Sequence, residues 1–155
     1  MIAKPNKPII FATDLSWSEN GQYVVSSHSL NHDIIISASH NNQATDNEWN
    51  AEQLFLSGIM ASLLNTYLDL SKKANLDNLG FECTATGQAE LVDGKMKFTF
   101  IHVYPKAFVK KAADIETALV ILEKAKKVCP LYNSVNAEII QHSEAAVAKK
   151  KNEAA

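Results

Sequence analysis

The stretch at residues 50–72, NAEQLFLSGIMASLLNTYLDLSK, is the feature that most limits how this chain can fold. Apolar side chains occur on nearly every side of a helix drawn through residues 54–64, which is typical of a buried helix. Asn50 and Gln53 have the spacing of a capping box, so we expect the helix to begin after Asn50 and to end near Lys73. The rest of the fold has to be built around this one long helix.

The remaining segments predict an α+β fold with antiparallel sheets. Six segments have the composition of strands, at residues 9–17, 22–28, 33–39, 81–92, 95–104 and 136–142. Asn20-Gly21 and Asp93-Gly94 are the expected hairpin turns, and Pro105 is expected to end the second hairpin. A second helix is predicted from Asp114, as its N-cap, to about residue 128. Strands and helices in this order favour α+β over a parallel sheet with alternating helices.

The length of 155 residues is enough for one domain with a real core. We expect a single domain over residues 1–142. Residues 143–155, EAAVAKKKNEAA after a serine, have little to bury and predict a flexible tail.

Composition excludes several classes of partner. The net charge of -2 gives no reason to expect nucleic acid or an anionic membrane. No apolar run is expected to span a bilayer, and residues 1–10 lack the apolar stretch of a secretory signal. We therefore expect a cytoplasmic protein with Cys83 and Cys129 as free thiols. All 15 basic residues are lysine, so a rigid bidentate guanidinium clamp is missing from the chain.

A stripe of small and polar residues runs along the long helix. Gly58, Ala61, Ser62 and Asn65 follow the i, i+3, i+4, i+7 spacing and share one face. Such a stripe either lets another backbone approach closely or leaves room for a ligand pocket. The residues themselves do not choose between these interpretations.

Cys129 is the other residue with notable local chemistry. It precedes Pro130, which suits the first position of a new short helix. A thiol at a helix N-terminus meets unpaired amides and is more reactive, whereas a buried cysteine behaves as a small hydrophobic residue. For Cys83, which lies in a predicted strand, the structural role is favoured.

The histidines do not predict a metal site. His28, His32 and His40 could align along strands but have no acidic or cysteine residues at ligand spacing. His102 and His142 are isolated in the sequence. We expect neither a metal ion nor another cofactor.

Two segments together resemble the OsmC/Ohr family, the osmotically inducible and organic-hydroperoxide-resistance proteins. NAEQLFLSGIMASLL is similar to the Asn-Pro-Glu-Gln-Leu-Phe motif that opens the family's central helix, and KAKKVCPLYNSV is similar to its second cysteine segment. The resemblance covers about residues 10–141. It implies an OsmC-like fold with sheets packed around a long buried central helix, in an intertwined homodimer with its sites at the subunit interface.

The resemblance also implies a chemistry. In active members a thiolate on the central helix reduces organic hydroperoxides, becomes a sulfenic acid and then forms a disulfide with the second cysteine. A glutamate and an arginine orient the first thiol. Glu52 matches the glutamate and Cys129 matches the second, resolving cysteine, but Ser62 occupies the peroxidatic position and the arginine has no counterpart.

The expected function follows from these departures. The family is linked to organic hydroperoxide detoxification and the stress response, but Ser62 cannot carry the two-cysteine cycle. We expect a small hydrophobic ligand at the dimer interface, with Gly58, Ala61 and Asn65 lining the pocket. The alternative is a thiol-dependent hydroperoxide reductase that uses Cys129 alone or together with Cys83.

Overall fold

The computed structural model describes residues 8–17, 22–27, 29–37 and 48–149. The chain divides into two compact units, residues 1–54 and residues 55–155. The predicted turn at Asn20-Gly21 lies outside the described residues. The single domain expected over residues 1–142 stays a prediction.

The first unit contains a small antiparallel sheet. Its strands are β1 (Asp14–Trp17), β2 (Tyr23–Ser26) and β3 (Ile34–Ile36), in the order β1-β2-β3. Each is shorter than predicted. Asp14 pairs with Ser26, the last residue of β2, so residues 9–13 have no partner in this sheet and stay outside the strand.

The long helix α1 (Ala51–Lys73) begins and ends where the sequence predicts. The Asn50 side chain accepts a hydrogen bond from the Gln53 backbone N–H at 2.7 Å, and the Gln53 side chain accepts one from the Asn50 N–H at 3.0 Å. This reciprocal pair is the predicted capping box, which satisfies two amide groups that a helix start otherwise leaves unpaired.

Within one chain α1 is buried on only one face. Ile59, Leu63 and Tyr67, four residues apart, are fully buried, whereas Ala61 and Leu68 on the other side are exposed. The prediction of a helix buried on nearly every side is therefore wrong for the single chain.

The expectation that no segment is long and apolar enough to span a bilayer is also wrong. By length and composition alone, α1 is such a helix, the one found among the described residues. A core helix of a soluble protein meets the same criterion, so this finding by itself is weak evidence for a membrane.

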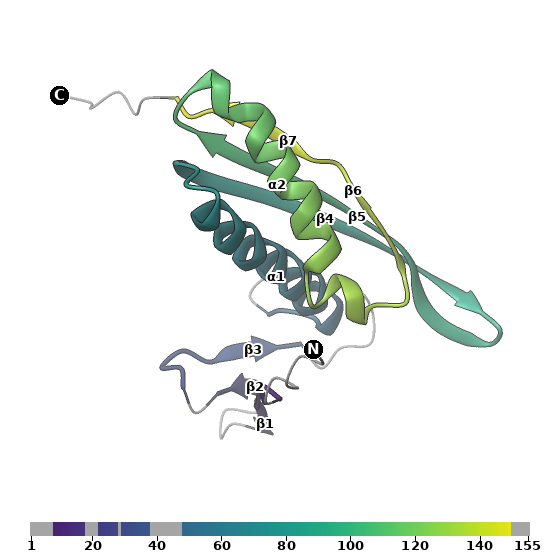
Figure 1. Ribbon diagram of the computed structural model, residues 1–155. Helices are drawn as coiled ribbons and strands as arrows, with labels where there is room; N and C mark the ends of the chain where they lie inside the picture. The colour runs from purple at the N-terminus through teal and green to yellow at the C-terminus, as the bar shows by residue number, and fades with distance from the viewer. Residues whose placement is uncertain (1–7, 18–21, 28, 38–47, 150–155) are drawn as a thin grey trace, which may run out of the picture. The chain divides into compact units, whose positions relative to one another are not determined.

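The second unit is built on a mixed sheet (Figure 1). Its strands are β4 (Asn78–Val92), β5 (Lys95–Val109), β6 (Glu138–Gln141) and β7 (Glu144–Val147). β4 and β5 form a long antiparallel hairpin, while β6 and β7 both pair with β5 in parallel. The sequence predicts antiparallel pairing, as β4 and β5 have it, and β6 and β7 differ by pairing in parallel. Asp93 and Gly94 have φ angles of 51° and 73°, as the predicted two-residue hairpin turn requires.

Pro105 does not end the hairpin, and β5 continues to Val109. The Val103 carbonyl accepts a hydrogen bond from the His142 N–H and the Val109 carbonyl accepts one from the Ala148 N–H, so odd-numbered residues of β5 bond on the β6/β7 side. Pro105 is also odd-numbered. It lies between Val103, which pairs with the last residue of β6, and Lys106, which pairs with the first residue of β7. Its missing N–H therefore faces a gap in the pairing, where proline is tolerated.

The helix α2 (Ile115–Val128) follows the short 3₁₀ helix η1 (Ala112–Asp114). Asp114 precedes α2 as predicted, but its side chain makes no capping hydrogen bond. α1 and α2 lie on the same face of the sheet (Figure 1). Their buried residues form one core with alternate residues of β5, namely Ile101, Val103, Ala107 and Val109.

The expectation of a tail from residue 143 is wrong for residues 144–147. These residues form β7, where Ala145 pairs with Ala107 and packs against the core. The alanine-rich stretch is small enough to fit beside β5 under α2, a role that its weak hydrophobicity does not reveal. The last residues, 150–155, lie outside the described part of the chain.

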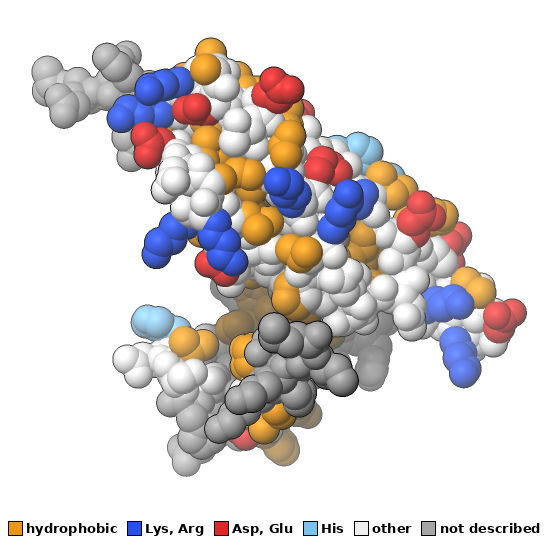
Figure 2. Space-filling model, viewed as in Figure 1, with side chains coloured by type: hydrophobic (Ala, Val, Ile, Leu, Met, Phe, Trp, Pro, Cys, Tyr) orange, Lys and Arg blue, Asp and Glu red, His pale blue; other side chains and the backbone are white. Residues whose placement is uncertain are grey.

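The visible surface of the second unit carries lysines and carboxylates side by side, with hydrophobic side chains between them (Figure 2). Two ion pairs of this kind join β5 or the segment after it to neighbouring residues: Lys106 with Glu144 at 3.2 Å and Lys110 with Asp77 at 3.8 Å. Exposed pairs such as these contribute little to stability.

Candidate functional site

Ser62 and Cys129 meet inside the second unit although 67 residues separate them. The Cys129 thiol donates a hydrogen bond to the Ser62 hydroxyl, with 3.2 Å between Sγ and Oγ. Ser62 lies in the middle of α1 and is half-buried, whereas Cys129 is fully buried. Two positions that the sequence singled out separately are thus adjacent in the fold.

Cys129 is not at the N-terminus of a short helix. It is the C-cap of α2, and its N–H donates to the Ala125 carbonyl at 2.8 Å. The next helical turn, η2 (Tyr132–Ser134), begins only three residues later, with Leu131 as its N-cap. The partial positive charge of a helix N-terminus is therefore not available to Cys129, which corrects the expected source of its reactivity.

Two members of the small-residue stripe face the segment after α2. A Cβ atom placed on Gly58 would lie 3.5 Å from the Leu131 Cδ1 atom, so Gly58 lies against the residue two positions beyond Cys129. Ser62, one turn further along α1, contacts Cys129 itself. Ala61 and Asn65 are exposed instead. The stripe therefore serves close packing at Gly58 and Ser62.

Glu52 lies in the first turn of α1 and is exposed. It belongs to residues 1–54, the first unit, so its expected role in orienting a thiol stays a prediction. A guanidinium partner is missing from the whole chain, because all basic residues are lysine.

A polar network that sequence reasoning missed begins beside Cys129. The Tyr132 hydroxyl donates to the Gln141 side-chain carbonyl at 2.9 Å, and the Gln141 amide donates to the Ser143 hydroxyl at 2.9 Å. The Ser143 hydroxyl in turn donates to Glu123 at 2.9 Å, and Gln141 also donates to the Leu122 carbonyl at 3.2 Å. This network joins η2, β6 and α2, and it fixes the segment that follows Cys129.

Tyr132 is the buried member of this network. Its pKa is raised, first by burial and then by the nearby Cys83, Cys129 and Glu123 when these are charged. The phenol therefore remains a protonated hydrogen-bond donor at any physiological pH.

The Tyr132→Phe variant is expected to lower the free energy of unfolding by about 1–2 kcal/mol. The change removes one hydroxyl and leaves the carbonyl oxygen of the half-buried Gln141 without its donor. Urea unfolding followed by far-UV circular dichroism measures the difference. Tyr104→Phe, at an exposed tyrosine, is the matched control and should change stability by less than about 0.5 kcal/mol; equal losses in both variants would contradict the role of the network.

Cys83 faces the core from β4, where Phe81 and Ala85 share its side of the sheet as predicted. Burial raises the pKa of the Cys83 thiol to about 11, with a backbone hydrogen bond at Tyr104 acting in the opposite direction. Near neutral pH this cysteine is therefore a protonated thiol and a poor nucleophile. The structural role that the sequence favoured agrees with this environment.

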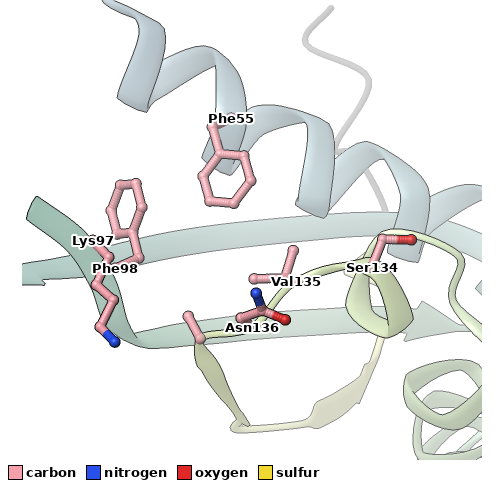
Figure 3. A pocket seen from close by; sticks show the side chains of 7 residues that line it. Phe55, Lys97, Phe98, Ser134, Val135 and Asn136 are labelled. Atoms are coloured by element: carbon pink, nitrogen blue, oxygen red, sulfur yellow. The ribbon is translucent and has the colours of Figure 1, made fainter. Parts of the chain in front are cut away.

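The second unit also has an open apolar cavity of about 250 Å³ (Figure 3). The Phe55 ring from α1 stacks on the Phe98 ring from β5 at 5.2 Å between centroids, and Val135 and Asn136 contribute from the segment before β6. A second hollow of about 390 Å³ shares Lys97, Phe98 and Asn136 with it. Neither space is lined by Gly58, Ala61 or Asn65, the residues expected to line a pocket.

The fold of the second unit is of the mixed α+β class. A long helix and a second helix cover one face of a sheet that is built on a hairpin. The family model for OsmC-like proteins matches residues 44–143, about two thirds of the chain. The chain belongs to the OsmC-like family. No curated protein sequence matches it.

Several solved structures share this fold at low sequence identity. An OsmC-like protein of unknown function from Vibrio cholerae superposes with a TM-score of 0.73 at 14% identity, covering 85% of this chain and 97% of the other. Organic hydroperoxide resistance proteins from Elizabethkingia anophelis and Bacillus subtilis (OhrB) give TM-scores of 0.65 and 0.62 at 16% and 19% identity. They cover 90% and 88% of this chain, and 99% and 98% of their own. At this identity the likeness establishes the fold.

Proposed function

We propose that this protein is a member of the OsmC-like family that acts in hydroperoxide resistance or the stress response without the two-cysteine peroxidase cycle. The observation that carries the proposal is the 3.2 Å contact between the Ser62 hydroxyl and the Cys129 thiol. If Ser62 stands at the peroxidatic position and Cys129 at the resolving position, the two should be neighbours, and they are.

The chemistry explains why the cycle is lost. A thiolate reduces a hydroperoxide by attacking one peroxide oxygen, which gives a sulfenic acid and an alcohol. Attack by a second thiol on the sulfenic sulfur then releases water and leaves a disulfide. The Ser62 oxygen can form neither product. Cys129 retains a thiol, but it is fully buried, and no sulfur faces it at position 62.

Proteins of similar structure support the broader role. Organic hydroperoxide resistance proteins from two bacteria share the fold, and the chain covers nearly the full length of each. A function connected with organic hydroperoxides that does not include their turnover fits both the family and the substitution at Ser62.

In this proposal, the protein binds a small hydrophobic molecule in the cavity beside Phe55 and Phe98. The cavity walls are mostly apolar, with Asn136 and Lys97 as polar groups at its side. Its volume of about 250 Å³ lies just below the usual range for ligand sites and suits a compact molecule of a few carbon atoms or one ring.

The proposal also includes a homodimer, which forms through the exposed face of α1. Ala61, Asn65 and Leu68 are exposed on this face, and exposed apolar side chains such as Leu68 on a helix of this length favour a partner. The small side chain of Ala61 allows a second helix to approach closely. A second copy of α1 is a self-complementary partner about a two-fold axis.

Cumene hydroperoxide tests both parts of the proposal. We expect it to bind without turnover: peroxide consumption with dithiothreitol as reductant stays at the rate without protein. Binding is followed by NMR shift changes, and Val135→Trp, which fills the cavity, should reduce them, while Leu79→Trp at an exposed position should not.

Turnover that disappears in Cys129→Ser would overturn the proposal and favour the one-cysteine reductase. Turnover that requires both Cys83 and Cys129 would favour the two-thiol form of that alternative. Binding without dependence on Val135 would contradict the assigned cavity while leaving the loss of chemistry intact.

A further inference from the structure

His102 and His142 form a side-chain pair on the second unit although the sequence shows them as isolated residues. The Nδ1 atom of His102 lies 3.1 Å from the Nε2 atom of His142. His102 lies in β5, and His142 follows β6, where its backbone N–H donates to the Val103 carbonyl at 2.8 Å. Parallel pairing of β6 with β5 brings the two imidazoles together across 40 residues of sequence.

The pair is held on the side of the sheet opposite the core. Ile101 and Val103, on either side of His102, are fully buried, so His102 points away from the two helices. The two imidazole planes lie within 15° of each other, and the Tyr104 ring stacks on His142 at 4.5 Å between centroids and 10° between planes. Stacking and strand pairing therefore hold the two rings beside each other.

We propose that His102 and His142 bind a divalent metal ion of the class that prefers imidazole nitrogen, represented by Zn²⁺. Zinc–nitrogen bonds are about 2.0–2.1 Å long, so two nitrogens 3.1 Å apart subtend roughly 100° at the ion, close to a tetrahedral angle. To bind the ion, each imidazole turns by about 40° so that its lone pair points at the ion instead of at the other nitrogen, which the exposed position of the pair permits. This site departs from the expectation of no metal, because the sequence alone could not pair the two residues.

Ion binding moves one proton within the histidine pair. In the neutral pair one nitrogen at the contact carries a hydrogen and the other accepts it. When the ion binds, that imidazole changes tautomer and carries its proton on the outward nitrogen, so both facing nitrogens offer lone pairs.

The charges around the pair permit a cation. Lys106 is the nearest basic residue along β5, and its ammonium group is paired with Glu144 at 3.2 Å. On β4, Thr86 pairs with His102 and Thr84 pairs with Tyr104, and on β6 Ile140 pairs with His102; all three are uncharged. No three histidine, cysteine or acidic side chains converge in the described part of the chain, so water supplies the remaining ligands and the affinity is that of a two-ligand site.

Zinc titration of the full chain by calorimetry, at pH 7.5, tests this proposal. We expect one ion per chain, with an affinity that falls at least on the order of tenfold in His102→Gln and in His142→Gln, since even outer-shell partners are worth that much. His32→Gln, at an exposed histidine of the first unit, should bind as the unaltered protein does. Cys83→Ser should also retain binding, which separates the imidazole site from thiol binding.

NMR provides a second measurement on folded variants. The imidazole signals of His102 and His142 should shift together on addition of Zn²⁺, while that of His32 should not. No binding, or equal affinity in His102→Gln, His142→Gln and His32→Gln, would overturn the site. Circular dichroism of each variant identifies any loss of folding.

Discussion

The Ser62→Cys variant is expected to form a disulfide with Cys129 in nearly all molecules under mild oxidation. The Ser62 oxygen already lies 3.2 Å from the Cys129 sulfur, and a disulfide bond is about 2.05 Å long. A side-chain rotation that moves the two sulfur atoms roughly 1 Å closer therefore allows the bond to form. The bond would close a loop of 67 residues. In the chain-entropy model such a loop stabilises the folded state by about 4 kcal/mol relative to the reduced variant.

Intact mass with and without reductant, followed by peptide mapping, identifies this disulfide. Thermal unfolding should show a higher Tm for the oxidised variant than for the reduced one. Ala61→Cys is the matched control, because it lies one residue away on α1 with an exposed side chain and should leave Cys129 reduced. A Ser62→Cys protein that keeps both thiols free after oxidation would contradict the placement of these two residues at one site.

The Ala61→Glu variant is expected to convert the proposed homodimer into a monomer. Ala61 lies in the centre of the exposed face of α1, and close approach of two helices there would bury two carboxylates without partners. The mass by light scattering should fall from twice 17.0 kDa to 17.0 kDa. Glutamate is nearly as good a helix former as alanine, so the helical content of the variant should persist.

Thr117→Glu, on the exposed side of α2, is the control for added charge and should remain a dimer. A dimer that survives Ala61→Glu would move the interface away from this face of α1. An unaltered protein that is monomeric at all concentrations would refute the homodimer itself.

Features set by neighbouring residues could be predicted from the sequence. The capping box at Asn50 and Gln53 and the turn at Asp93-Gly94 are local, since each depends on contacts within a few residues. Both bounds of α1 were therefore predicted correctly. The same holds for the alternation of buried and exposed residues along β4, which repeats every second residue.

Features set by distant strands could not be predicted in this way. Whether Pro105 interrupts β5 depends on a gap between β6 and β7, about 40 residues later in the chain. β7 itself has a weakly hydrophobic sequence and becomes a strand only because β5 offers an edge. At the candidate site, Ser62 and Cys129 were singled out through resemblance and local pattern, but Tyr132 carries no sequence signal of its network with Gln141.

The central position of β5 also has a consequence for the order of folding. The β4–β5 hairpin is local, with a two-residue turn, and hairpins of this kind form within microseconds. β6 and β7 can pair only with an edge that β5 already presents, and closing the longer connection through α2 costs more chain entropy. Cys129 lies in that connection. The contact between Ser62 and Cys129 is therefore expected among the last to form, and an unfinished chain that ends before β6 would contain both residues without a fixed site.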